Sequence, residues 1–149
     1  IFFRALAMVG IPDEFGYVVI VIGLSWFMNF FLVTLVIMAR KKYGVEYPTL
    51  YADKDHKGAE KFNCVQRAHQ NTLENWSSIQ ILMLINGLVM PRAAAALGLI
   101  WVLGRVIYGL GYTYYGPRGR MVGGLLSHVG DFPLILMTFY TGAQMVGWA

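Results

Sequence analysis

Three polar residues at helical spacing mark the part of this sequence that could do chemistry. Arg67, Asn71 and Glu74 stand at positions i, i+4 and i+7, which a helix places on one face. The segment runs on into an apolar stretch and predicts a membrane helix. A guanidinium, an amide and a carboxylate facing lipid are costly, so we expect them to face protein, water or a ligand. Spacing alone supports a binding site and an interhelical ion-pair network equally well.

A second polar face lies on a later apolar segment. Arg105, Tyr108 and Tyr112 stand at i, i+3 and i+7 and again share one side of a helix. We interpret Tyr114 and Tyr115 differently, as part of an aromatic belt at the membrane interface. Three further arginines flank the apolar segments: Arg40, Arg118 and Arg120.

Together these groups suit a small zwitterion with several carboxylates and one amine. Arginine binds carboxylates through paired hydrogen bonds, Glu74 can accept an ammonium group, and tyrosine hydroxyls and Asn71 can hold peptide amides. A free thiol has a pKa of about 8.5, and a neighbouring cation lowers it. Glutathione carries this combination of groups, and the apolar helix surfaces would admit a lipid-soluble electrophile.

Hydrolytic and metal chemistry find little support. No Ser-His-Asp arrangement is evident, and the three histidines lie on different segments without ligand spacing. His128 and Asp131, at i and i+3, are interpreted as a local pair or a contact to another subunit rather than a catalytic dyad. The single cysteine, Cys64, excludes a disulfide within the chain and is interpreted as a small buried helix residue.

The composition indicates one small integral membrane domain across residues 1–149. Of the residues, 57% are hydrophobic and 13% are charged, whereas a soluble domain carries roughly 25% charged residues. The net charge of +4 comes mainly from loops, which favours contact with membrane lipid headgroups. No basic stripe alternates with aromatics, so no nucleic acid partner is expected. Because the sequence begins at Ile1, we expect either a missing start or a removed targeting segment.

Four apolar segments predict an all-α membrane protein, an up-down-up-down four-helix bundle with short second and third connections. Pro133 is expected to kink the last helix. By the positive-inside rule, the first and third loops face the cytosol or its organellar equivalent. The predicted helices span residues 15–39, 62–90, 93–115 and 121–147.

Three segments carry a family resemblance. They are ARKKYGVEYP from Ala39 to Pro48, FNCVQRAHQNTLE from Phe62 to Glu74, and GRVIY from Gly104 to Tyr108 with the following Gly111-Tyr112. With them the chain resembles the MAPEG family, the membrane-associated proteins of eicosanoid and glutathione metabolism, and within it the type-three microsomal glutathione transferases. The likeness covers most of residues 15–120, and its second segment is long and highly specific.

The resemblance implies a homotrimer with four transmembrane helices per subunit and glutathione bound between neighbouring subunits. In the family the arginine that activates the thiolate lies at the start of the fourth helix, which points to Arg120 first and Arg118 second. The residues that the resemblance places around glutathione are Arg40, Arg67, His69, Asn71, Glu74, Arg105, Tyr108 and Tyr112.

Two functional hypotheses follow. The first is a membrane glutathione transferase or peroxidase acting on lipophilic electrophiles or lipid hydroperoxides, in the endoplasmic reticulum or in a mitochondrial or plastid membrane. The second is a non-catalytic subunit of a larger membrane complex. Departures from the family pattern motivate the second: Glu74-Asn-Trp-Ser-Ser lacks the usual proline after the glutamate, and Asp131 and Pro133 are unexpected in the fourth helix.

Overall fold

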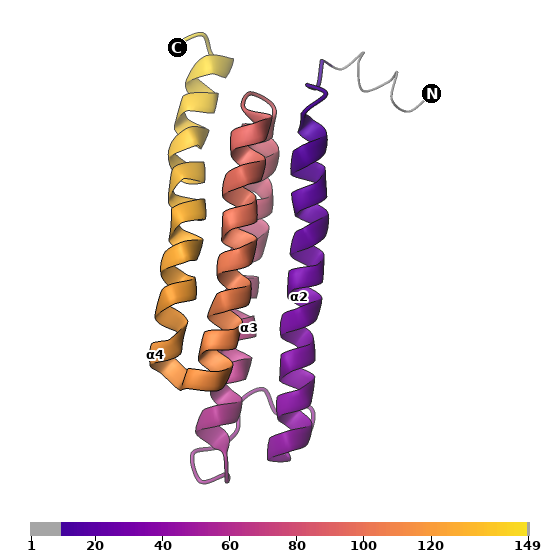
Figure 1. Cartoon of the computed structure of the whole chain (residues 1–149), viewed down its shortest axis with the longest axis vertical. Coiled ribbons are helices and arrows are strands. Elements are labelled where there is room, and N and C mark those ends of the chain that lie inside the picture. The colour runs from indigo at the N-terminus through magenta and orange to yellow at the C-terminus, as the bar shows by residue number, and fades with distance from the viewer. Residues whose placement is uncertain (1–9, 149) are drawn as a thin grey trace, which may run out of the picture.

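Three helices form almost all of the described protein. The computed structural model describes residues 10–148, in which α2 spans Phe15–Tyr43, α3 spans Ala59–Gly87 and α4 spans Pro91–Met145 (Figure 1). No strand occurs in that part of the chain. The prediction of an all-α protein is therefore confirmed. Helix α3 begins and ends three residues earlier than the predicted 62–90.

Helix α4 reverses direction at Gly116 (Figure 1). This residue has φ 68° and ψ −155°, the non-helical angles inside α4, and glycine adopts a positive φ without steric cost. Pro117 follows at once and suits the first position of a new helical stretch. Two arms result, residues 91–115 and 117–145, and they run antiparallel. The second arm starts earlier than the predicted 121–147, so Arg118 and Arg120 lie on a helix and not in a loop, while Pro133 keeps helical angles.

Glycines let the two arms of α4 approach backbone to backbone. Gly111 and Gly119 face each other so closely that a side chain on either would collide with the backbone of the other. A side chain at Gly123 would likewise strike the backbone of Tyr108. Small residues allow this kind of contact between membrane helices, where dispersion forces rather than the hydrophobic effect hold helices together.

All three helices contribute to one apolar core. Leu32 of α2, Met83 of α3 and Trp101 and Leu134 from the two arms of α4 are almost fully buried in the same cluster. Large apolar side chains also cover the outside, such as Phe27 on α2, which is 75% exposed. Helices α2 and α4 are long and apolar enough to cross a membrane. A span needs about 20 residues, and α4 has 55, so its length suffices for both arms.

A polar cluster joins α2 to α3 within this apolar surrounding. The hydroxyl of Ser25 is fully buried and accepts hydrogen bonds from Trp76 Nε1 at 3.0 Å and from Gln80 Nε2 at 2.6 Å. It donates its own proton to the carbonyl of Ile22 at 2.7 Å. One oxygen atom thus satisfies two donors of the neighbouring helix.

Replacing Ser25 with alanine is expected to destabilise the protein by about 1 kcal/mol, because two half-buried donors, Trp76 and Gln80, lose their fully buried acceptor. Thr34→Ala is the matched control, since the Thr34 hydroxyl is bonded to the Phe30 carbonyl of its own helix and stabilises no other element. Thermal unfolding in detergent measures both variants. Equal midpoints for the two variants would contradict the assigned role of Ser25.

Candidate functional site

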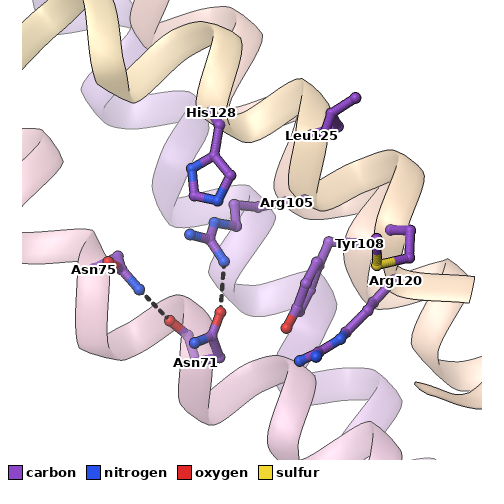
Figure 2. Close-up of a pocket in the computed structure, with 9 residues that line it drawn as sticks. Asn71, Asn75, Arg105, Tyr108, Arg120, Leu125 and His128 are labelled. Atoms are coloured by element: carbon purple, nitrogen blue, oxygen red, sulfur yellow. Dashed lines mark hydrogen bonds between the residues drawn. The ribbon is translucent and has the colours of Figure 1, made fainter. Parts of the chain in front are cut away.

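A pocket of about 450 Å³ lies between α3 and the two arms of α4 (Figure 2). Its wall combines two arginines, two asparagines, a tyrosine and a histidine with a few apolar residues, and it contains no carboxylate. Such a wall favours an anionic guest that also presents amide groups. The lining residues are Asn71, Asn75, Arg105, Tyr108, Arg120, Met121, Gly124, Leu125 and His128.

Arg105 is the buried cation of this pocket, and a hydrogen bond holds it in position. It comes from the first arm of α4, is 3% exposed, and donates from Nη1 to Asn71 Oδ1 at 2.8 Å (Figure 2). Asn75 donates to the backbone carbonyl of Asn71 at 2.9 Å. The guanidinium carbon of Arg105 also lies 5.1 Å from the Trp101 ring centroid and 5.4 Å from the Tyr108 ring centroid. These contacts hold Arg105 in place, and its Nε keeps no partner within the described part of the chain.

Arg120 is the exposed cation. It comes from the second arm of α4, and its guanidinium carbon lies 5.5 Å from the Tyr112 ring centroid. Tyr108 and Tyr112 pack edge to face with ring centroids 5.6 Å apart, and Figure 2 shows the guanidinium beside Tyr108. The reversal at Gly116 thus brings two arginines, 15 positions apart in the sequence, to one pocket. Arg118 is exposed and does not line the pocket.

The predicted polar face of α3 exists. Arg67 Nη1 donates to Glu74 Oε1 at 2.8 Å, and Asn71 Nδ2 lies 3.4 Å from Glu74 Oε2. The side chains of Arg67 and Glu74 are 43% and 42% exposed, and they lie outside the pocket wall. Asn71 belongs to both sets, since it contacts Glu74 on its own helix and Arg105 across the pocket.

Two predicted site residues hold other parts of the fold together. Arg40 donates to the backbone carbonyls of Val45 at 3.3 Å and Thr49 at 2.8 Å, and its guanidinium lies 4.3 Å from the Tyr47 ring centroid. It thereby fastens the loop that follows α2. His69 Nε2 lies 3.1 Å from Asn29 Oδ1 and joins α3 to α2. Neither lines the pocket.

Two polar lining residues, Asn75 and His128, were not among the predicted site residues. Asn75 follows Asn71 by four positions, so the helical period could have included it. The predicted local pair is confirmed: His128 Nδ1 lies 3.1 Å from both carboxylate oxygens of Asp131. No spacing in the sequence relates this pair to Arg105, whose pocket it borders. Within residues 10–148, no three His, Cys, Asp or Glu side chains gather in a way that could hold a metal ion.

Comparison with known proteins supplies the family. The sequence pattern of the MAPEG family matches residues 18–140. A protein of Synechocystis sp. described as uncharacterized protein sll1147 is 34% identical over 123 residues, which cover 78% of this chain and 81% of that protein. The match extends over most of α2, all of α3 and most of α4, and the apolar helices agree with a family of membrane proteins. The chain therefore belongs to the MAPEG family, and it is an integral membrane protein built from helices.

Proposed function

We propose that this protein is a membrane glutathione transferase or peroxidase, closest in type to the type-three microsomal glutathione transferases. The observation that carries the proposal is the pocket in which Arg105 and Arg120, from opposite arms of α4, meet the amides of α3. Glutathione brings two carboxylates, two peptide amides and a thiol. Members of the MAPEG family use glutathione, which agrees with the chemistry of this wall.

In the proposed reaction Arg120 stabilises the thiolate of glutathione. Its guanidinium is exposed and bound to no carboxylate in the described chain, so it is free to face an anionic sulfur. Arg105, held by Asn71, remains in one position and can bind a carboxylate of the peptide. Met121 and Leu125 give the pocket an apolar edge, where a lipophilic electrophile or lipid hydroperoxide can enter. Proximity to the aligned thiolate then lowers the barrier to attack.

The exposed ion pair on α3 supports an oligomer. Arg67 and Glu74 are both more than two-fifths exposed in the single chain, and charged groups inside a membrane rarely face lipid. A second copy covering this face would remove that cost and extend the pocket with Arg67 and Glu74. We therefore propose the homotrimer of the family, with glutathione between neighbouring subunits. In this arrangement α2, α3 and the two arms of α4 serve as four spans of an up-down-up-down bundle.

The basic residues at and after the end of α2 support the proposed orientation. Residues 44–58 follow three basic residues at the end of α2 and contain Lys54 and Lys57. The reversal of α4 carries Arg118 and Arg120. Positive charge near membrane helices marks the cytosolic side. Both connections therefore face the cytosol if the protein lies in the endoplasmic reticulum membrane, or the equivalent compartment if it lies in an organellar membrane.

One observation favours a non-catalytic subunit as a second candidate. Arg105 already bonds Asn71, and Arg67 already pairs with Glu74, so this network holds without a ligand. A recruited subunit would exist as one copy beside unrelated membrane proteins. Native mass spectrometry separates the two candidates, because a homotrimer that retains glutathione supports the enzyme.

The function itself is tested with the purified protein in detergent. We expect glutathione to raise the unfolding temperature, and we expect the protein to conjugate glutathione with chlorodinitrobenzene and to reduce cumene hydroperoxide. S-methylglutathione is the matched control: it keeps the charges that bind but has no free thiol. It should stabilise the fold and support no turnover. Absence of both stabilisation and turnover with glutathione would overturn the proposal.

A further inference from the structure

We infer that His128, oriented by Asp131, is a catalytic proton carrier in this pocket. It accepts the proton of the glutathione thiol and delivers it to the oxygen that leaves when a hydroperoxide is cleaved. The inference rests on the proposed function and adds a residue to it. With this residue the enzyme is expected to prefer substrates whose leaving group must be protonated.

Three contacts fix the His128 ring at the pocket wall. Its Nδ1 lies 3.1 Å from both carboxylate oxygens of Asp131, and its ring stacks on Phe132 with centroids 4.9 Å apart and planes 27° apart. Asp131 is almost buried, with its side chain 12% exposed, whereas the His128 side chain is 52% exposed. Figure 2 shows the imidazole in the pocket beside the Arg105 guanidinium. The carboxylate therefore sits behind the ring, and the free edge of the ring faces the pocket.

The carboxylate also determines the tautomer. An ionised carboxylate only accepts hydrogen bonds, so the proton of the neutral ring must be on Nδ1. Nε2 then carries the lone pair and can accept a proton from a guest. This is the orientation in which a carboxylate makes an imidazole a general base and stabilises the imidazolium that forms.

Charged groups of both signs surround the ring. Asp131 provides a negative charge on the Nδ1 side of the ring, and the guanidinium of Arg105, from the first arm, lies beside the ring in the pocket. Arg120 is the other cation of the wall, and α3 contributes the neutral amides of Asn71 and Asn75. A thiolate held by Arg120 would offset the positive charge that the ring gains.

In the proposed reaction His128 transfers one proton from the thiol to the leaving alkoxide. Nε2 takes the thiol proton, which leaves a thiolate and an imidazolium. The thiolate sulfur attacks the terminal oxygen of the hydroperoxide, the S–O bond forms, and the O–O bond breaks with its electron pair on the alkoxide. The imidazolium protonates that alkoxide and returns to the neutral ring. Sulfur is oxidised to the sulfenic acid and the peroxide is reduced to the alcohol. A second glutathione then gives the disulfide and water.

Chloride displacement provides an internal comparison. When the thiolate attacks chlorodinitrobenzene, the C–S bond forms and chloride leaves with its electron pair. Chloride is a very weak base and needs no proton, so the thiol proton can go directly to solvent. An alkoxide is strongly basic, and its departure gains from a positioned acid. Loss of His128 should therefore affect the two reactions unequally.

The test is His128→Gln in the full-length protein in detergent, assayed with cumene hydroperoxide and with chlorodinitrobenzene. We expect kcat for the hydroperoxide to fall by about a hundredfold, at the lower end of the range known for general acid–base groups. We expect kcat for chlorodinitrobenzene to change by less than about threefold, since that step uses no acid. His56→Gln, the same substitution in the loop after α2, is the matched control and should leave the ratio of the two rates unchanged.

Asp131→Asn keeps the test valid if His128→Gln does not fold. Asparagine can donate to Nδ1 and so favour the other tautomer, which removes the lone pair from Nε2. The hydroperoxide rate should fall, again more than the chlorodinitrobenzene rate. Equal loss of both rates in either variant, or no loss, would overturn the role of His128. Absence of both activities in the unmodified protein would instead refute the proposed function.

Discussion

Replacement of Arg120 with alanine is expected to lower glutathione-dependent turnover by about a hundredfold, the effect of removing one group that stabilises an anion in an enzyme site. Arg120 is the exposed guanidinium of the pocket and contacts the face of Tyr112. Without it the thiol returns toward its ordinary pKa, and less thiolate is present at neutral pH. Glutathione binding should remain measurable, because Arg105 and Asn71 are unchanged. Rates for chlorodinitrobenzene and calorimetric binding of glutathione measure the two effects separately.

Arg118→Ala is the control for Arg120→Ala. It removes the same charge two positions earlier, from an exposed position outside the pocket wall, and we expect turnover close to that of the unmodified protein. Arg120→Lys should recover only part of the rate, because an ammonium cannot reproduce the planar fork of a guanidinium. If neither alanine variant changes turnover, arginine does not activate the thiol. If only Arg118→Ala abolishes it, Arg118 takes the role in the oligomer.

Replacement of Gly123 with valine is expected to have the largest effect on folding. The new Cβ would strike the backbone nitrogen and Cα of Tyr108 and the carbonyl of Gly104, none of which can move without separating the arms of α4. Overpacking of this kind costs about 3 kcal/mol, and contact with backbone leaves little room for relief. Because Tyr108 and Arg120 lie on the two arms, the pocket should be lost together with the packing. The measurement is thermal unfolding, with size-exclusion chromatography to detect aggregation.

Gly142→Ala is the matched control for the glycine variant. Gly142 also lies in the second arm of α4, and a side chain there would meet nothing within 4 Å. Alanine favours helix over glycine by about 0.8–1.0 kcal/mol, so this variant should be as stable as the unmodified protein or slightly more so. A Gly123→Val protein that unfolds at the same temperature as Gly142→Ala would refute the close packing of the two arms.

The local features of this protein follow from residues that are close together in the sequence. Apolar runs predicted the long helices, and the predicted helix 93–115 ends directly before the reversal at Gly116. The helical period placed Arg67, Asn71 and Glu74 on one face, and their side chains do interact there. The resemblance found in the same residues agrees with membership of the MAPEG family. Each of these depends on neighbours along the chain, which a sequence records directly.

Which side chains come into contact depends on how the helices pack. Arg118 and Arg120 are two positions apart, about 200° around a helix, so both cannot face one pocket, and the choice depends on where the second arm begins after Gly116. That starting point also sets the direction of His128, which the sequence related only to Asp131. The bond from Arg105 to Asn71 likewise joins residues of two different helices. Rotation and separation of helices follow from close contacts such as Gly123 against Tyr108, and these depend on residues distant in the sequence.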